Sequence, residues 1–336
     1  MKESQSLLDQ LGGEFGCLRL ATEFYSRVAK NTDLKPLFPG KSLRCATEEF
    51  SAFLVQFLDG DESKTQYRWW LSLKESHGRF QISEEQRSAW LGLMRETIHD
   101  LYEDPETRQT LQRFFLTSSA YIVGKSQAEI GHTELSHRWE TQKSLDRLVE
   151  YIAKGYDFDA IELTKKFKSR PAVFVGILEK MMATGRELPV EFVLASITAN
   201  PDLVDHPYNG RGLLHFAAGC SCLPVVQLLI TIGADPNTSD SGGHAPLYRV
   251  ASTNGSIDGS TIIRELVRAG AAMNHNGGVM RATALHQAAR FGDLEVAKAL
   301  VDAGANPMAR DKKGLTPLDR AVSGRRHKVA AFLASL

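Results

Sequence analysis

A short phrase centred on a leucine recurs four times in the C-terminal part of the chain, at intervals of 33, 38 and 33 residues. The four positions are Leu214, Leu247, Leu285 and Leu318. Each phrase opens a short apolar helix, a second apolar helix follows, and the unit then ends at a glycine such as Gly233 or Gly304. One such unit cannot bury its own apolar face, so this period predicts a stack of helical units.

The repeated phrase resembles the ankyrin repeat, a helix pair of about 33 residues that begins Thr-Pro-Leu-His and is followed by a β-turn. Two of the phrases read Thr283-Ala284-Leu285-His286 and Thr316-Pro317-Leu318. The second unit departs from the period through a polar insertion at Ser252-Thr253-Asn254-Gly255-Ser256, which we expect to form a loop. The resemblance implies an α-solenoid of about four ankyrin repeats over residues 201–336, with a concave surface for a protein partner.

His215 and His286 occupy equivalent places in two of these phrases. We expect both side chains to hydrogen-bond the backbone between repeats and not to bind a metal. Cys220 and Cys222 lack the second cysteine pair of a zinc site.

Composition limits the possible partners and the location. The 336 residues suggest roughly two or three domains, and the 40 basic and 40 acidic residues cancel. No overall basic charge favours nucleic acid or an anionic membrane, and no apolar stretch reaches the ~20 residues that span a bilayer. The first residues lack the apolar core of a signal peptide, and four scattered cysteines do not form a disulfide framework. We therefore expect a cytoplasmic protein.

Four apolar stripes at helical spacing predict four amphipathic helices in the first 125 residues. Their members are Phe15, Leu18, Thr22, Tyr25 and Ala29; Phe50, Phe53, Leu54 and Phe57; Trp90, Leu91, Met94 and Ile98; and Leu111, Phe114, Phe115, Ser118 and Ile122. Asp104 is expected to cap the fourth helix and Pro105 to be its first residue. So many aromatic side chains indicate either a packed core or a pocket for a flat apolar group, and composition alone favours the core.

The region between these parts, residues 126–200, is expected to be a helical linker or cap. Residues 125–137 are polar and indicate a linker, and helical runs with breaks at Gly155 and Pro171 follow. A run at Glu191-Phe192-Val193-Leu194-Ala195 suggests a degenerate repeat that caps the solenoid.

The order and spacing of several phrases in residues 7–124 resemble a truncated haemoglobin, the short globin in which two helices pack over two. The phrases are Phe24-Tyr25-Ser26-Arg27-Val28-Ala29, Leu34-Lys35-Pro36-Leu37-Phe38-Pro39, Phe53-Leu54-Val55-Gln56-Phe57, His77-Gly78-Arg79-Phe80-Gln81-Ile82 and Glu85-Gln86-Arg87-Ser88-Ala89-Trp90. Trp90 together with Tyr25 is most similar to the second group of the family. The fold class is therefore all-α: a truncated globin over residues 1–125, the helical region over 126–200, and the ankyrin solenoid.

By this resemblance, His77 matches the residue that ligates the iron of haem b, the expected cofactor. Its other ring nitrogen should donate to a backbone carbonyl, which would define the tautomer. Without the resemblance, His77 would be interpreted as a solvent-facing histidine before a turn. His99 is the rival in this segment and lies off the third stripe.

The resemblance also implies a pocket around His77. Tyr25 and Trp90 match donors that stabilise a bound diatomic gas; as core residues they would still need hydrogen-bond partners. The residues matched to the haem pocket are Phe38, Ala46, Phe50, Phe53, Lys74 and Phe80. Lys74 is expected either to pair with a haem propionate or to be solvated.

The chain departs from the family just before His77. Relatives usually carry a Gly-His-Pro phrase and a basic run there, whereas this chain has Trp69-Trp70-Leu71-Ser72-Leu73. The departure puts the shape of the proximal side in doubt, or it indicates that Trp69 and Trp70 contact the neighbouring helical region.

Three functions remain open. The first is a haem protein that reversibly binds dioxygen, nitric oxide or carbon monoxide and is coupled to the ankyrin array as a sensor or carrier. The second is a haem enzyme, either a nitric oxide dioxygenase or peroxidase-like, although the sequence has no flavin or dinucleotide fingerprint to supply electrons. The third is a haem-free interaction scaffold.

Overall fold

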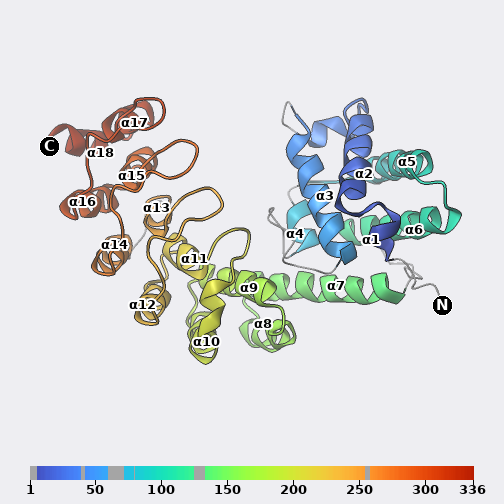
Figure 1. Cartoon of the computed structure of the whole chain (residues 1–336), viewed down its shortest axis with the longest axis horizontal. Helices are drawn as coiled ribbons and strands as arrows, with labels where there is room; N and C mark the ends of the chain where they lie inside the picture. Colours follow the sequence, from blue (N-terminus) through green and yellow to red (C-terminus); the bar gives the residue numbers. More distant parts are fainter. Residues whose placement is uncertain (1–5, 39–41, 60–71, 79, 125–132, 254–257) are drawn as a thin grey trace. The chain divides into compact units, whose positions relative to one another are not determined.

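The computed structural model describes residues 6–38, 42–59, 72–78, 80–124, 133–253 and 258–336, and this part of the chain contains helices and an isolated β-bridge but no strand (Figure 1). The predicted all-α fold class is confirmed. The helices form two compact units, Met1–Glu150 and Tyr151–Leu336. None of the described helices is both long enough and apolar enough to cross a bilayer.

Two packed helix pairs make up most of the first unit. Its elements are α1 (Leu7–Gln10), α2 (Gly13–Val28), the 3-10 turn η1 (Lys35–Leu37), α3 (Arg44–Asp59), α4 (Leu73–His77), α5 (Glu84–Leu101), α6 (Pro105–Ile122) and α7 (Thr133–Lys154). α2 packs on α3 and α5, and α5 packs on α6. Phe24, Leu54 and Phe114 lie in the core between them.

Local sequence explains where several of these helices begin. Gly12 and Gly13 both adopt a positive φ, and a Cβ on Gly16 would lie 1.7 Å from the Leu11 carbonyl oxygen, so the turn from α1 into α2 requires glycine. The predicted cap of α6 is confirmed, because the Asp104 carboxylate accepts from the Thr107 N–H and Pro105 is the first helical residue.

The predicted buried face of α2 is wrong. Phe15 is 76% exposed and Leu18 is also exposed. The core face instead carries Cys17, Leu20, Phe24 and Val28. A second set of residues at helical spacing, turned by about 100° from the predicted stripe, was equally compatible with the sequence, and the positions of α3 and α5 select between the two.

Helix α7 belongs largely to the first unit. Trp139 packs edge-on against Phe57 and Tyr121, with ring centroids 6.2 and 5.3 Å apart, and the Arg138 guanidinium donates to the Phe57 carbonyl at 2.8 Å. Part of the predicted linker, residues 125–132, lies outside the described residues, and residues 133–137 open α7. The observed unit boundary falls inside α7, at Glu150, whereas the predicted domain boundaries were residues 125 and 200.

The second unit is a row of stacked helix pairs (Figure 1). Its elements are α8 (Asp157–Thr164), η3 (Lys165–Phe167), α9 (Pro171–Ala183), α10 (Glu187–Ala199), η4 (Pro201–Asp205), α11 (Leu213–Gly219), α12 (Leu223–Thr231), α13 (Pro246–Val250), α14 (Gly259–Arg268), α15 (Ala284–Phe291), α16 (Leu294–Asp302), α17 (Pro317–Ser323) and α18 (His327–Ala334). α11, α13, α15 and α17 pack in sequence on one another, and α12, α14, α16 and α18 form a parallel row. α9 packs on α11 and α10 on α12, so the pair before the first repeat continues the stack.

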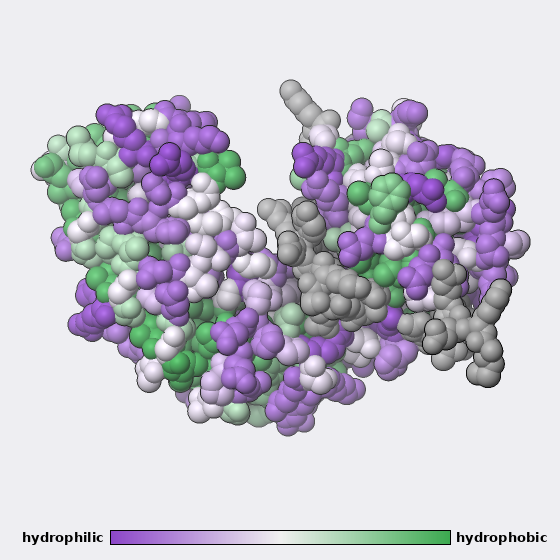
Figure 2. All heavy atoms as spheres, viewed as in Figure 1, coloured by the Kyte–Doolittle hydropathy of each residue, from purple (hydrophilic) through white to green (hydrophobic). Residues whose placement is uncertain are grey.

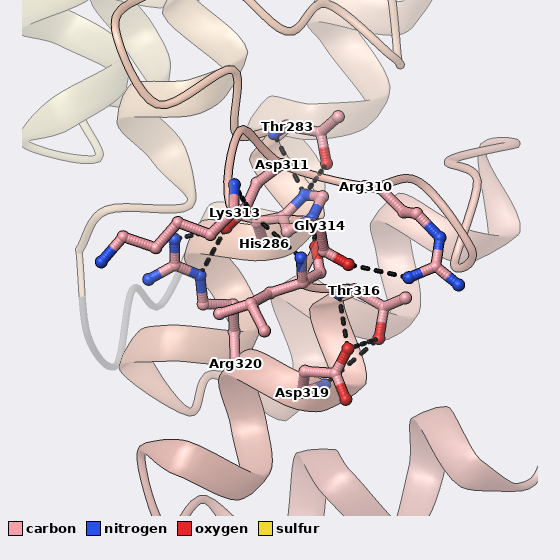
Figure 3. Close-up of polar contacts among 10 residues, drawn as sticks. Thr283, His286, Arg310, Asp311, Lys313, Gly314, Thr316, Asp319 and Arg320 are labelled. Atoms are coloured by element: carbon pink, nitrogen blue, oxygen red, sulfur yellow. Dashed lines mark hydrogen bonds and ion pairs between the residues drawn. The ribbon is translucent and has the colours of Figure 1, made fainter.

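Buried polar residues tie neighbouring repeats together. The His286 Nε2 atom lies 3.0 Å from the Leu315 carbonyl oxygen, and His215 makes the equivalent bond to His244. Both predicted bonds between the histidines and the backbone are confirmed. The adjacent loop is held by the Asp311 carboxylate, which accepts from the Lys313 N–H and from the Arg320 guanidinium (Figure 3). Residues 254–257 of the predicted insertion lie outside the described residues.

Candidate functional site

A cavity of about 520 Å³ lies inside the first unit, between α2, α3, α4, α5 and α6. Its volume falls within the range of small-molecule and cofactor pockets. Eight of the nine residues predicted for the site line this cavity: Tyr25, Phe38, Ala46, Phe50, Phe53, His77, Phe80 and Trp90. Residues that are as far apart in the sequence as Tyr25 and Trp90 are therefore brought to one place.

His77 is the last residue of α4, a short helix capped by the Ser72 hydroxyl. The imidazole is half-buried, and its Nδ1 atom lies 2.8 Å from the Leu73 carbonyl oxygen. The Ser76 hydroxyl also lies 2.9 Å from Nδ1 and itself donates to the Leu73 carbonyl. Because a carbonyl oxygen only accepts, this arrangement favours the neutral ring with the proton on Nδ1 and the lone pair on Nε2. This is the tautomer that can coordinate a metal through Nε2, with the ring oriented by the backbone as the sequence predicted.

Tyr25 and Trp90 contribute two polar groups to a largely apolar cavity. Within the described residues, neither the Tyr25 hydroxyl nor the Trp90 indole N–H has a hydrogen-bond partner. Half-buried groups of this kind usually find one. Burial, together with the nearby charge of Glu49, raises the pKa of Tyr25 well above its ordinary value. The Tyr25 hydroxyl therefore stays protonated and can donate a hydrogen bond to a ligand in the cavity.

Aromatic rings form much of the remaining wall. The Phe38 ring packs edge-on against Tyr25 with centroids 5.5 Å apart and lies 6.3 Å from the Phe80 ring. Phe50 lies 6.1 Å from Tyr25. Such walls offer flat apolar surfaces, beside which polar contacts are strengthened by the low local dielectric.

Lys74 is the predicted site residue that the structure does not bring to the cavity. Its ammonium group lies 4.3 Å from the centre of the Tyr121 ring. On α4 the cavity is lined by Leu73, Ser76 and His77, which share a helix face by their spacing of three and four residues. Lys74 is exposed and is not among the residues that line the cavity, so its predicted pairing with a propionate, or its solvation, stays a prediction. Trp69 and Trp70 lie outside the described residues.

Two residues near the cavity were missed by the sequence analysis. Gln56 lines the cavity at 7% exposure, and its Oε1 atom has no hydrogen-bond partner within the described residues. Its spacing from Ala46, Glu49 and Phe53 along α3 was the available signal. Asp146 of α7 is buried and accepts from the Lys74 backbone N–H at 3.4 Å, so α7 contacts the helix that carries His77. No local pattern links positions 74 and 146.

Comparison with known proteins matches separate segments of the chain: one segment carries the cavity, and two carry the repeats. Residues 6–120 match the bacterial-like globin family, residues 209–241 match the ankyrin repeat, and residues 251–336 match a family of three ankyrin repeats. The chain is 30% identical over 117 residues to the group 2 truncated hemoglobin YjbI of Bacillus subtilis (strain 168), covering 35% of this chain and 88% of that protein.

Two further relatives match over about 100 residues of this chain. They are the mitochondrial disaggregase of Bos taurus, at 35% identity over 30% of this chain, and the human SH3 and multiple ankyrin repeat domains protein 1, at 40% identity over 28% of this chain. The chain spans 14% and 4% of the length of these two proteins.

Proposed function

Because this chain belongs to the bacterial-like globin family, as a truncated haemoglobin followed by ankyrin repeats, we propose that its first unit binds haem b in the cavity through His77 and reversibly binds a diatomic gas. The gas is dioxygen, nitric oxide or carbon monoxide. The observation that carries the proposal is the meeting of three groups in one cavity: an imidazole whose Nδ1 atom faces a backbone carbonyl, and two hydrogen-bond donors that have no partner among the described residues.

The residues of the cavity fit this cofactor. Haem, when bound, supplies an iron atom with one coordination position for a protein imidazole and one for a gas. His77 provides the imidazole, oriented by the Leu73 carbonyl. The aromatic walls around Phe38 and Phe50 would pack against the flat apolar ring of the cofactor. Tyr25 and Trp90 would supply the hydrogen-bond donors for a polar gas ligand, which would slow its release.

The ankyrin array is the second part of the proposed function. Stacked repeats of this kind present an extended surface, and such surfaces generally bind proteins. We propose that the gas-binding unit is coupled to a cytoplasmic protein partner held by the repeats, as a sensor or a carrier.

The absorption spectrum of the full chain, expressed with an ample haem supply, tests this function. We expect an intense Soret band in the purified protein, and we expect His77→Gly to lose most of it because the iron loses its protein ligand. Free imidazole should restore part of the band. His99→Gly is the matched control, since His99 is an exposed imidazole on α5 outside the cavity.

The spectrum also separates the alternatives. A colourless wild-type protein would support the haem-free scaffold and contradict the proposal. Equal loss of the band in His77→Gly and His99→Gly would show that the decline comes from general damage to the fold and would remove the ligand role of His77.

A further inference from the structure

We propose that the last two ankyrin repeats bind an acidic, partly apolar segment of a partner protein along a strip of exposed cations, which we call the basic edge. This inference rests on the proposed protein-binding role of the repeats and is independent of haem. The basic edge consists of the exposed side chains of Arg281, Arg290, Arg310, Lys312, Lys313, Arg325, Arg326 and Lys328.

Most of the cations of the basic edge have no carboxylate partner within the described residues. The exception is Arg310, which donates to the Gly314 carbonyl and lies near Asp319, a carboxyl whose pKa is lowered first by hydrogen bonds from Thr316 and then by the charge of Arg310. None of the eight side chains forms a direct ion pair within the described residues. The neighbouring carboxylates are already engaged: Asp311 is buried against Arg320, and Asp319 accepts from the backbone of Thr316. Glu295 pairs with Lys298 on α16. In a chain with no net charge, this concentration of exposed cations is a local feature.

A comparison between repeats shows that one of these arginines is held in a costly conformation. Gly210, Gly243 and Gly314 occupy equivalent positions in three loops and have φ values of 67°, 78° and 75°. The equivalent position in the third repeat is Arg281, at a φ of 49°. Glycine has no Cβ and adopts this left-handed region at no steric cost. The Cβ of arginine makes the same conformation costly. Folding alone therefore favours glycine at position 281.

The same replacement occurs at a second position. Gly292 has a φ of 87° in the turn between the helices of the third repeat, and its equivalent in the fourth repeat is Arg325, at a φ of 55°. Ser221 occupies the position in the first repeat. Strained residues that the fold does not require are candidates for a role in binding. Two independent positions thus place an exposed arginine where the stability of the repeat would favour a smaller residue.

Backbone contacts bring these cations together in two groups. The Lys312 N–H donates to the Met280 carbonyl at 2.9 Å, so the loops that carry Arg281 and Lys312 lie side by side. The Arg326 guanidinium donates to the Arg290 carbonyl at 3.1 Å, which joins the two helix turns. Helix α17, of seven residues, separates the groups by about 10 Å. An extended segment of roughly eight residues is long enough to reach both groups.

The figures agree with an accessible, mostly hydrophilic surface in this region. Figure 3 shows Arg320 turned toward Asp311, while the Lys313 ammonium points away from that cluster. Figure 2 shows predominantly hydrophilic residues over the end of the array that carries α17, with apolar residues between them.

The apolar residues beside the basic edge favour a peptide over a nucleic acid. Val279, Met308 and Val322 are between 62% and 78% exposed. No aromatic side chain is among the large exposed hydrophobic residues of the two repeats, whereas single-stranded nucleic acids are generally bound by stacking on aromatic rings. Arginine clusters are a common means of recognising acidic motifs. Carboxylates interleaved with apolar residues would match both the cations and the exposed aliphatic groups.

Titration of the full chain with a fluorescent peptide of about eight residues, in which aspartate and glutamate alternate with leucine, tests the proposal. We expect binding that weakens as salt is added and that is lost when amides replace the carboxylates. Arg281→Gly and Arg325→Gly should each weaken binding about fivefold, and the double variant about 25-fold if the two sites act independently. The matched control is Lys298→Gln, which removes an exposed positive charge of the third repeat outside the basic edge.

Thermal unfolding of the same variants separates binding from folding. The two glycine variants should be at least as stable as the wild type, because glycine relieves the left-handed strain. Unchanged peptide affinity in the double variant would overturn the proposal. A clear loss of stability in either single variant would also overturn it, and so would tighter binding of an oligonucleotide of equal charge. A chain with a Soret band and no peptide binding contradicts this inference alone, whereas a colourless chain that binds the peptide contradicts only the haem role.

Discussion

Tyr25 and Trp90 reach the same cavity from helices α2 and α5, and each brings one donor without a partner in the described part of the protein. Their chemistry and order were readable in the sequence by resemblance to truncated haemoglobins. Their lack of protein partners was not readable, because it depends on every side chain that surrounds them. Gln56 illustrates the same limit, since its unpaired Oε1 atom is a property of the assembled cavity.

Tyr25→Phe tests the donor role of the hydroxyl. Loss of one hydrogen bond to bound dioxygen should speed its dissociation about threefold to tenfold, because such a bond contributes about 1 kcal/mol. Stopped-flow displacement of dioxygen by carbon monoxide gives the rate. Tyr102→Phe is the control, because Tyr102 has a buried hydroxyl with no partner among the described residues but does not line the cavity. An unchanged rate in Tyr25→Phe would remove the role proposed for its hydroxyl.

At the scale of elements, helical periodicity located α3, α5 and α6 well, because these amphipathic helices bury the face that their pattern predicts. The same reasoning chose the wrong face of α2. The mostly polar composition of residues 125–137 concealed the start of α7, a helix of 22 residues, although Leu135 within it is buried in the core of the first unit. Its contribution to the first unit depends on contacts with α3, α4 and α6 that no local pattern contains.

Trp139→Ala tests whether α7 is part of the globin unit. Removing a buried tryptophan that packs on Phe57 and Phe114 should lower the free energy of unfolding of the first unit by about 3 kcal/mol. Urea unfolding followed by the fluorescence of the remaining tryptophans measures this change. Phe15→Ala is the control, since an exposed ring should contribute within about 0.5 kcal/mol. Equal stability of the two variants would exclude α7 from the core of the unit.

At the scale of the whole molecule, the two units have separate cores and can be observed separately. All four tryptophans lie in the first unit, so tryptophan fluorescence reports that unit alone, while far-ultraviolet circular dichroism reports the helices of both. Comparison of the two signals therefore distinguishes unfolding of the ankyrin repeats from unfolding of the globin.

The stability of the second unit should depend on pH through the ionisation of Asp240. Burial of this carboxyl opposes its ionisation, but hydrogen bonds from Arg249 and from the His244 N–H outweigh burial and lower its pKa from 3.8 to about 2. A depressed pKa stabilises the folded state above the unfolded pKa, and this stability is lost as the pH falls from about 4 to about 2. The shift corresponds to about 2 kcal/mol.

Asp240→Asn provides the measurement. The variant should lose about 2 kcal/mol of stability in the second unit at neutral pH and should show a weaker dependence on pH between about 4 and 2. Unfolding of the second unit is measured as the change in far-ultraviolet circular dichroism that occurs without a change in tryptophan fluorescence. The same acid dependence in the variant and the wild type would show that other carboxyls control the acid unfolding of the repeats.

Sequence alone was sufficient for the features that repeat or act locally: the period of the ankyrin units, the glycine turns, the cap at Asp104, and the order of Tyr25, His77 and Trp90 along a truncated globin. These follow from backbone conformation and from helical spacing, which neighbouring residues determine. Folding in three dimensions was needed to show which side of α2 is buried, that the Lys74 ammonium lies over the Tyr121 ring, and that Asp146 reaches the helix of His77. Each of these depends on packing between segments far apart in the chain, and a local pattern carries no information about which distant surface it will meet.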